Sequence, residues 1–257
     1  MIGLPNCMER NVAGDGRNHI LYDFEVDRQP IPAHKFTKPK VKPRLVTEDG
    51  NTFLRMYGSI EDKFPVDPWK VTTSRTTVGA SVIRSQLPDY SELTKAQYYS
   101  AHIRADKDHY DKGSASIFEL FQSGYRAPYG SGGFDSKGPV ARFLISKDKL
   151  VFFVNYDETT KQNIYTHGKW DPNHWYHLEI YAVWSHDPNE GLIEAYVDGK
   201  LLARFSGRGT ILGPRSYKIP YAKFGLYGKY STGRIDIDNI ETGPWRRRGE
   251  LPMDSCD

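Results

Sequence analysis

The sequence predicts an all-β fold in which two sheets pack into a sandwich of the jelly-roll type. Aromatic residues make up 13% of the 257 residues and glycines number 23, while only 38% of the residues are hydrophobic, which is typical of short amphipathic strands joined by turns. Many segments alternate between apolar and polar residues, and no convincing long helical pattern competes with them. So many short strands bury their apolar faces most simply as two packed sheets.

The strand candidates follow one another along the chain, separated by turn residues. They are residues 20–27, 52–57, 76–84, 97–104, 116–122, 140–146, 150–156, 174–184, 192–197, 200–205, 221–227 and 234–240. Asp198-Gly199 is the clearest hairpin turn, because this dipeptide favours the two-residue loops that join antiparallel strands. Another turn is predicted at Glu48-Asp49-Gly50-Asn51, just before the strand at 52–57.

We expect a single domain over residues 1–257, with its core between about residues 20 and 243, because no internal repeat or low-complexity linker divides the chain. Lysine and arginine exceed aspartate and glutamate by only 35 to 32, so the net charge of +3 gives no argument for a nucleic-acid partner. No apolar run is long enough to span a membrane. A monomeric protein without nucleic-acid or membrane partners is the expectation.

The two cysteines, Cys7 and Cys256, lie near opposite ends of the chain. Chain termini are often close together in compact domains, so a disulfide between the two is one interpretation, and two free thiols are the other. A disulfide implies an oxidising compartment. Residues 1–10 lack the apolar core of a signal peptide, so if the protein is secreted this sequence is its mature form. A secreted, extracellular protein is the expectation.

The segment from Tyr221 to Tyr227 is the strongest candidate for a functional surface. Alternation along a strand places Tyr221, Lys223 and Tyr227 on one face, with Gly225 between them, and small apolar residues on the other face. Two phenols and an ammonium beside an accessible backbone suit a flat polar ligand such as a sugar chain. A half-buried strand with tyrosines at its rim is the alternative.

The segment from Gln122 to Gly138 combines glycines with aromatic and basic residues, among them Tyr125, Arg126 and Tyr129. A long loop inside a compact domain is usually either functional or disordered. We interpret this one as a flap that closes over a ligand and contributes these three residues to substrate binding. A plain surface loop is the alternative.

Several short motifs also occur in a recognisable order between about residues 23 and 243. They include Gly50-Asn51-Thr52-Phe53-Leu54-Arg55, Ser74-Arg75-Thr76, Tyr98-Tyr99-Ser100-Ala101-His102, Ile117-Phe118-Glu119-Leu120-Phe121-Gln122, Gly191-Leu192-Ile193-Glu194-Ala195-Tyr196-Val197-Asp198-Gly199-Lys200 and Lys223-Phe224-Gly225-Leu226-Tyr227. In this order the chain resembles the heparin lyase I-like polysaccharide lyases, which have a concanavalin-like β-jelly roll and include relatives acting on glucuronan.

The resemblance implies an enzyme that cleaves an anionic polysaccharide containing uronic acid by β-elimination. A base removes the proton at C5, an acid assists departure of the glycosidic oxygen at C4, and the site neutralises the carboxylate as charge develops. By match to the Lys-x-Gly-x-Tyr strand of such lyases, Tyr227 is the acid, and also the base in a syn elimination. By match to the glutamine of the central strand, Gln122 binds the carboxylate. Glucuronan, alginate and glycosaminoglycans all remain open as substrates.

The family pattern commonly places a histidine near that glutamine, and this chain has none there. His102, on one face with Tyr98 and Arg104, and His177 are therefore candidates for the base, with a structural role as the alternative for each.

Two arginines, Arg75 and Arg84, are candidates for substrate binding from their strand. Solvated ion-pair partners are the alternative interpretation.

No cofactor is expected for catalysis. Asp236, Asp238 and Asn239, with Asp23 and Glu25, are candidates for a structural calcium site of the kind found in many concanavalin-like folds, with isolated strand carboxylates as the alternative. Asp23 and Asp238 are the ligands we expect first.

Two other functions fit a sandwich of this kind. A non-catalytic carbohydrate-binding module needs aromatic platforms but no phenol at the scissile bond. A glycoside hydrolase needs two converging carboxylates, for which Glu119 and Glu179 are present, but the Glu-x-Asp-x-x-Glu pattern of sandwich hydrolases is absent.

Overall fold

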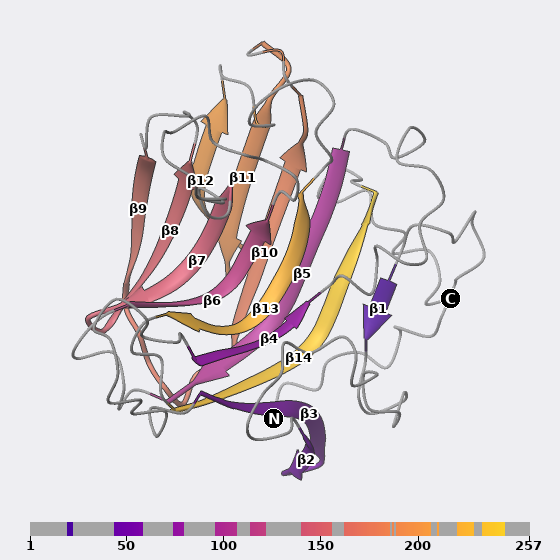
Figure 1. Cartoon of the computed structure of the whole chain (residues 1–257), viewed down its shortest axis with the longest axis vertical. Helices are drawn as coiled ribbons and strands as arrows, with labels where there is room; N and C mark the ends of the chain where they lie inside the picture. Colours follow the sequence, from indigo (N-terminus) through magenta and orange to yellow (C-terminus); the bar gives the residue numbers. More distant parts are fainter. Residues whose placement is uncertain are drawn as a thin grey trace, which may run out of the picture.

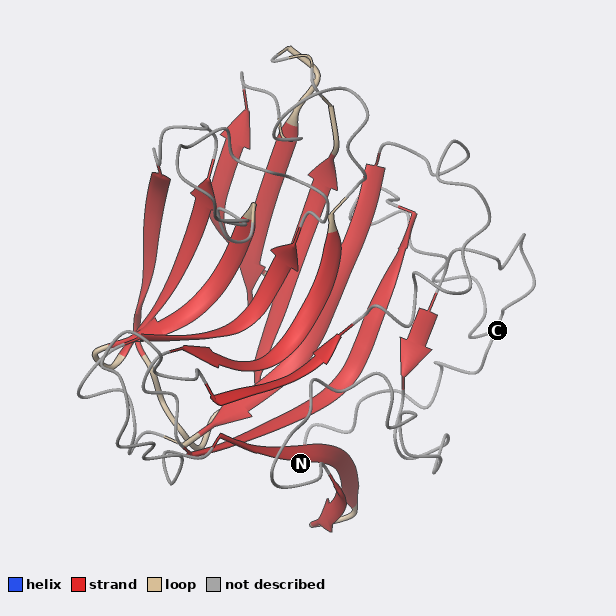
Figure 2. Cartoon of the chain, viewed as in Figure 1, coloured by secondary structure: helices blue, strands red, loops and turns tan. Residues whose placement is uncertain are grey.

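A computed structural model describes residues 20–22, 44–58, 74–79, 96–106, 114–121, 140–155, 162–185, 187, 189–206, 210, 220–228 and 233–244. Over these residues the chain forms strands and short turns without any helix (Figure 2). The strands form two antiparallel sheets that pack face to face (Figure 1). The predicted all-β sandwich is therefore confirmed.

The larger sheet has eight strands. Its order is β12-β11-β10-β5-β14-β3-β2, and β1 pairs with β14. The bounds are Ile20–Tyr22 for β1, Arg44–Glu48 for β2, Asn51–Gly58 for β3, Ala96–Ala105 for β5, Tyr176–Val183 for β10, Leu192–Val197 for β11, Lys200–Ser206 for β12 and Gly233–Pro244 for β14.

The smaller sheet has six strands in the order β4-β13-β6-β7-β8-β9. The bounds are Ser74–Gly79 for β4, Ser114–Phe121 for β6, Ala141–Ser146 for β7, Lys149–Asn155 for β8, Gln162–Lys169 for β9 and Tyr221–Gly228 for β13. Strands that are distant in sequence are neighbours here, since β13 lies between β4 and β6, and such long crossovers are typical of a jelly roll.

One hydrophobic core fills the space between the sheets. From the smaller sheet, Phe118 packs against Phe224 and Phe143 with ring centres 4.4 and 5.9 Å apart. Tyr99 of β5 and Trp184, which directly follows β10, are buried, and their polar atoms are satisfied: the Trp184 indole donates to the Tyr99 hydroxyl (3.1 Å), which donates to the carbonyl oxygen of Pro220 (3.0 Å). The prediction of one domain over residues 1–257 extends beyond the described strands and stays a prediction.

The hairpins follow the turn chemistry of the sequence. Asp198 and Gly199 have φ values of 49° and 76°, as a two-residue hairpin loop of the primed type requires, and the predicted turn is confirmed. Asp49 and Gly50, with φ values of 53° and 82°, join β2 to β3 in the same way. That turn was predicted, but β2 was not, because it lies at the end of a segment rich in lysine and proline. The edge strand β9 was also missed.

Candidate active site

The outer face of the smaller sheet carries the predicted surface of strand β13. Ala222, Phe224 and Leu226 are fully buried in the core, so alternation places positions 221, 223, 225 and 227 on the outer face. The predicted grouping of Tyr221, Lys223 and Tyr227 on one face is therefore consistent with the strand. Of these three side chains the structure describes that of Lys223, which is partly exposed.

A β-bulge interrupts this strand at Gly225. The register of β13 against β6 shifts between Phe224 and Tyr227, and Gly225 has a φ of 137°, which residues with a side chain rarely adopt. Bulges re-aim neighbouring side chains and are frequent beside active sites. The glycine in the Lys-x-Gly-x-Tyr motif thus allows the backbone bulge two residues before position 227.

The neighbouring strands bring further residues to the same face. Tyr227 lies directly opposite Arg75 of β4 and Ser116 of β6. Lys223 lies opposite Glu119 of β6, and Glu119 lies opposite Arg142 of β7. Residues directly opposite in antiparallel strands point to the same side, with Cβ atoms about 4.5–5.5 Å apart. Arg75, expected from the sequence to bind substrate, is therefore a direct neighbour of Tyr227.

A second bulge lies in β6. The register against β7 shifts between Ser116 and Phe118, and both Ile117 and Phe118 are buried in the core. Ser116 and Glu119 consequently occupy the outer face although they are three positions apart. The two bulges are adjacent, in neighbouring strands, next to the position of Tyr227.

The sequence singled out neither Glu119 nor Arg142 as a member of this surface. Glu119 is only 3% exposed, and the Arg142 guanidinium carbon lies 5.2 Å from the centre of the Phe153 ring on β8. Strict alternation does not reveal Glu119, because the bulge at Ile117 and Phe118 changes the phase within β6. For Arg142, alternation gives the face, but only the strand order places it beside Glu119.

Several predicted site residues lie outside the described residues. They are Gln122, Arg84, Tyr125, Arg126, Tyr129, Asp23, Cys7 and Cys256. The flap, the calcium ligand at Asp23 and the disulfide stay predictions. Gln122 directly follows Phe121, the last residue of β6, which pairs with Tyr221.

The candidate bases His102 and His177 lie elsewhere. They are directly opposite each other on β5 and β10, with rings stacked 4.4 Å apart at 9°. Because Tyr99, Ala101 and Ile103 fill the core, His102 points away from it, to the outer face of the larger sheet. Strands β5 and β10 belong to the larger sheet and β13 to the smaller one (Figure 1), so both histidines lie on a different sheet from Tyr227. This corrects the expectation that one of them acts as base with Tyr227 on a single bound sugar.

The histidine pair is electrostatically unusual. Burial, and next the charge of His177, lower the pKa of His102 from its ordinary 6.5 to about 4. Nδ1 of His177 lies 3.7 Å from a carboxylate oxygen of Glu179, whose other oxygen accepts hydrogen bonds from the hydroxyls of Tyr98 (3.4 Å) and Tyr181 (3.3 Å). Glu179 therefore faces away from the core on the larger sheet and cannot converge with Glu119, which argues against the two-carboxylate arrangement of a glycoside hydrolase.

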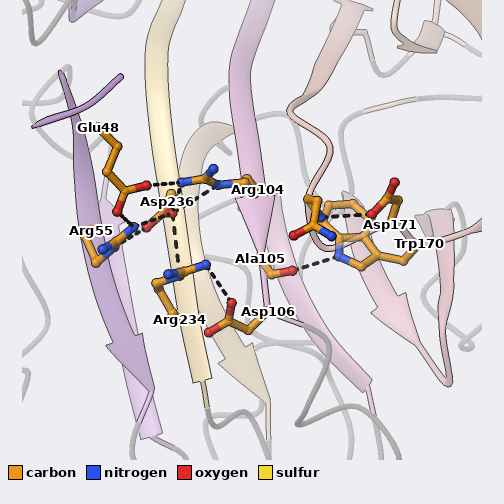
Figure 3. Close-up of polar contacts among 10 residues, drawn as sticks. Glu48, Arg55, Arg104, Ala105, Asp106, Trp170, Asp171, Arg234 and Asp236 are labelled. Carbon is orange, nitrogen blue, oxygen red and sulfur yellow. Dashed lines mark hydrogen bonds and ion pairs between the residues drawn. The ribbon is translucent and has the colours of Figure 1, made fainter. Parts of the chain in front are cut away.

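The larger sheet also carries an ion network centred on Asp236 of β14 (Figure 3). The fully buried Asp236 carboxylate accepts hydrogen bonds from Arg55 (2.7 and 3.0 Å) and Arg104 (2.8 and 3.2 Å). The same two arginines bind Glu48 at 2.8 and 3.0 Å and hold the pKa of its carboxyl below the usual value. Asp236, engaged by these arginines, is thus not available as a calcium ligand.

Asp238 was the other described candidate ligand for calcium. Its Oδ1 accepts the backbone N–H of Asn239 at 2.8 Å. In the part of the chain that the structure describes, no three histidine, cysteine, aspartate or glutamate residues form a group that would hold a metal ion. A calcium site involving Asp23 and Asp238 stays a prediction.

A family model described as polysaccharide lyase matches residues 40–241, most of the chain and nearly all of the sandwich. The chain belongs to this polysaccharide lyase family. It is thus a polysaccharide lyase with the jelly-roll architecture that the sequence predicted. No curated protein gives a significant match. No helix among the described residues is long and apolar enough to cross a membrane.

Solved structures of similar fold include two alginate lyases. One, from a Chlorella virus, has 11% sequence identity and a TM-score of 0.51, with 79% of this chain and 89% of that chain covered. The other, from polysaccharide lyase family 7, has 10% identity and a TM-score of 0.50, with 90% and 96% covered. A carbohydrate esterase of the Shiga toxin-encoding bacteriophage phi24B has 9% identity and a TM-score of 0.53, with 88% and 98% covered. At these identities the likeness of this lyase to the three proteins concerns the fold.

Proposed function

We propose that this lyase cleaves a uronic acid-containing polysaccharide by β-elimination on the outer face of the smaller sheet, with Tyr227 as the proton-transferring residue. The observation that carries the proposal is the register of β4, β13 and β6, which sets Tyr227 directly opposite Arg75 and on the same strand face as Lys223. A strand face whose positions carry a phenol and two cationic residue types suits an acidic sugar.

The reaction requires a proton to leave C5 and the bond between C4 and the glycosidic oxygen to break, which leaves a double bond between C4 and C5. In a syn elimination, one ionised phenol at Tyr227 accepts the C5 proton and then donates it to the leaving oxygen, so the tyrosine ends as it began. A single residue is sufficient because both atoms lie on the same side of the sugar. Both histidines lie on the outer face of the larger sheet, which supports one tyrosine, rather than a tyrosine–histidine pair, as the proton-transferring group.

The C5 proton becomes acidic only when negative charge on the neighbouring carboxylate is stabilised. Arg75 is suited to this role, because a guanidinium binds a carboxylate through two parallel hydrogen bonds. Lys223, two pleats along β13 from Tyr227, would bind the carboxylate of an adjacent sugar. Gln122, which follows β6, would add a neutral hydrogen-bond donor to the developing enolate.

Polymer panels test this proposal. The protein is incubated separately with glucuronan, alginate, hyaluronan, chondroitin sulfate, heparin and a neutral glucan, and ultraviolet absorption of the unsaturated product is followed. Absorbance should rise with at least one uronate polymer and not with the glucan. If no uronate polymer yields an unsaturated product while the protein is folded, the proposed reaction is wrong.

A further inference from the structure

Two lysines lie directly opposite each other on the outer face of the smaller sheet. Leu150 and Phe152 of β8 are fully buried in the core, so alternation points Lys149 to the outer face, where it is exposed. Lys149 lies opposite Lys169 of β9, which is also exposed, and residues directly opposite share a face with Cβ atoms about 4.5–5.5 Å apart. Two lysine side chains therefore leave the sheet side by side, on the face that carries the position of Tyr227.

A β-bulge in β9 brings the two lysines to the same face. The register of β8 against β9 shifts between Leu150 and Val151, where β9 contains one extra residue. Gly168 in this bulge has a φ of 147°, which residues with a side chain rarely adopt. Thr166 lies opposite Val151, and strict alternation from Thr166 would turn Lys169 inward. The bulge thus returns Lys169 to the outer face.

The backbone beside both lysines is held by hydrogen bonds. The N–H of Trp170, the residue after Lys169, donates to the carbonyl oxygen of Asp148, the residue before Lys149, at 2.6 Å. The Trp170 side chain is 1% exposed, and its indole N–H donates to the carbonyl oxygen of Ala105 on the larger sheet at 2.9 Å (Figure 3). The two lysines therefore extend from a backbone that is anchored to the core, which limits the entropy lost when their charges meet a ligand.

The pairing of two lysines is unfavourable for the sheet by itself, because like charges directly opposite each other repel. Lys147, in the turn before β8, is a third exposed cation, and Asp148 lies between Lys147 and Lys149 in the sequence. Within the described ranges, neither Lys149 nor Lys169 makes an ion pair with a carboxylate. This corner of the sheet therefore carries more positive than negative charge, and an external anion would relieve the repulsion.

The lysine pair lies several strands away from the proposed centre of reaction. Strands β13, β6, β7, β8 and β9 lie side by side in this order (Figure 1). Because neighbouring strands are about 4.8 Å apart, Lys149 lies roughly 14 Å and Lys169 roughly 19 Å across the sheet from Tyr227. Val151 belongs to the row that runs from Tyr227 across β6 and β7, and Lys149 is about 7 Å from it along β8. A polymer that crosses the strands from Tyr227 towards β9 meets the lysines several sugar units from the cleaved bond.

We propose that Lys149 and Lys169 form a remote subsite that binds the carboxylate of a uronic acid several units away from the cleaved bond. The inference rests on the proposed function and deepens it, because it names where the enzyme holds a long chain. A carboxylate between the two ammonium groups replaces their repulsion with two attractions. The contact is the same before and during the reaction, so it raises affinity rather than the rate of the chemical step. The lyase therefore prefers long chains to short oligosaccharides.

Chain length separates this subsite from the residues that act on the cleaved bond. KM is measured for the long polymer and for an oligosaccharide of it that is too short to reach from Tyr227 to β8. A double variant, Lys149→Gln with Lys169→Gln, should raise KM for the long polymer by about tenfold, which corresponds to about 1.4 kcal/mol, and the rise should be confined to the long polymer. Lys149→Arg with Lys169→Arg keeps both charges and should keep the wild-type KM.

Lys200→Gln is the matched control for the loss of charge. Lys200 is an exposed lysine on β12 of the larger sheet. Its removal lowers the net charge of the protein without touching the proposed subsite, so KM for the long polymer should stay at the wild-type value.

The outcomes separate the two proposals. If the double glutamine variant keeps the wild-type KM for the long polymer, or if KM rises equally for the short oligosaccharide, the subsite is wrong and the lyase reaction stands. An equal rise in Lys200→Gln would show a general effect of charge and would also overturn the subsite. If no uronate polymer is cleaved, the proposed function itself fails and the inference fails with it.

Discussion

The outer faces of the two sheets differ in how their charges are matched. On the larger sheet, Arg55, Arg104 and Arg234 face the carboxylates of Glu48, Asp106 and Asp236 at 2.7–3.6 Å (Figure 3). On the smaller sheet, one carboxylate, Glu119, lies in a row between Lys223 and Arg142, and the position of Arg75 adds a further cation. The larger sheet thus joins its arginines and carboxylates in one ion network, whereas the row on the smaller sheet alternates cation and carboxylate across neighbouring strands.

This contrast separates a structural network from a binding surface. Arginines that are already saturated by buried carboxylates gain little from an external anion, because binding it would first require breaking those pairs. We propose that the substrate binds the smaller sheet, on the face that carries position 227, and that the network of the larger sheet contributes stability.

The largest effect on stability is expected at the centre of the balanced network. Asp236→Asn removes the charge that pairs with Arg55 and Arg104, of which Arg55 is itself buried. Breaking a buried ion pair in this way should lower the free energy of unfolding by about 3–5 kcal/mol, as measured by urea denaturation. The folded fraction should retain the wild-type kcat on the polymer.

Asp198→Asn is the matched control for that substitution. Asp198 Oδ2 lies 2.8 Å from Nε2 of His174 with both side chains exposed, and its Oδ1 accepts the backbone N–H of His177 at 2.9 Å, which an asparagine oxygen can also accept. An exposed pair contributes little, so the change should cost no more than about 1 kcal/mol. If both substitutions lowered the free energy of unfolding equally, the Asp236 network would contribute no more to stability than an exposed pair.

A smaller effect, confined to acid, is expected from the stacked histidines. Burial lowers the pKa of His102 in the folded protein to about 4, whereas the unfolded chain has the ordinary 6.5. The unfolded state therefore binds the proton first, and stability present at neutral pH should fall as the pH drops from about 6.5 to 4, by up to about 3 kcal/mol. The free energy of unfolding, measured across this interval, should depend less on pH in His102→Gln than in wild type.

The comparison at pH 8 gives the cost of the substitution itself, because the imidazole is then neutral in both states. The groups that face His102 across the neighbouring strands are His177 on β10 and Asp238 on β14. An identical pH profile in both proteins would show that His102 does not titrate in the proposed range. If folded His102→Gln protein lost lyase turnover at neutral pH, the claim that catalysis belongs to the smaller sheet alone would be wrong.

The sequence predicted the regular parts of this molecule well. In strand β13 the core residues Ala222, Phe224 and Leu226 alternate along the sequence, which is why a common face for positions 223 and 227 could be predicted, whereas the β-bulge at Gly225 could not. Asp198-Gly199 likewise identified its turn, because few other residues adopt that backbone conformation without cost.

The irregular parts of the molecule could not be predicted from the sequence, for identifiable reasons. Two consecutive inward residues at Ile117 and Phe118 change the phase of β6, so Glu119 could not be placed. Strand β9 lies at the edge of its sheet, and Ile164, 59% exposed, contradicts an inward apolar pattern. The turn between β7 and β8 uses Lys147 and Asp148, at φ values of 54° and 87°, without any glycine.

The sheet on which the two histidines lie could be determined only from the strand topology. Alternation gave the face of β5 on which His102 lies, but the sequence does not say which of the two outer faces that is. Strand order across the whole chain decides this, because β5 is central in one sheet and β13 lies in the other. Candidate residues on different strands can be combined into one site only once that order is known.

The central claim is that catalysis belongs to the smaller sheet through the phenol of Tyr227, and one paired measurement tests it most directly. Tyr227→Phe is compared with Tyr196→Phe, a tyrosine of the larger sheet whose hydroxyl donates to Glu194 at 2.9 Å. On the best uronate polymer, Tyr227→Phe should lose about 10²–10⁴-fold in kcat with polymer binding retained, since general acid–base groups typically contribute that much. Tyr196→Phe should keep wild-type turnover. Near wild-type turnover in a folded Tyr227→Phe protein would contradict the account.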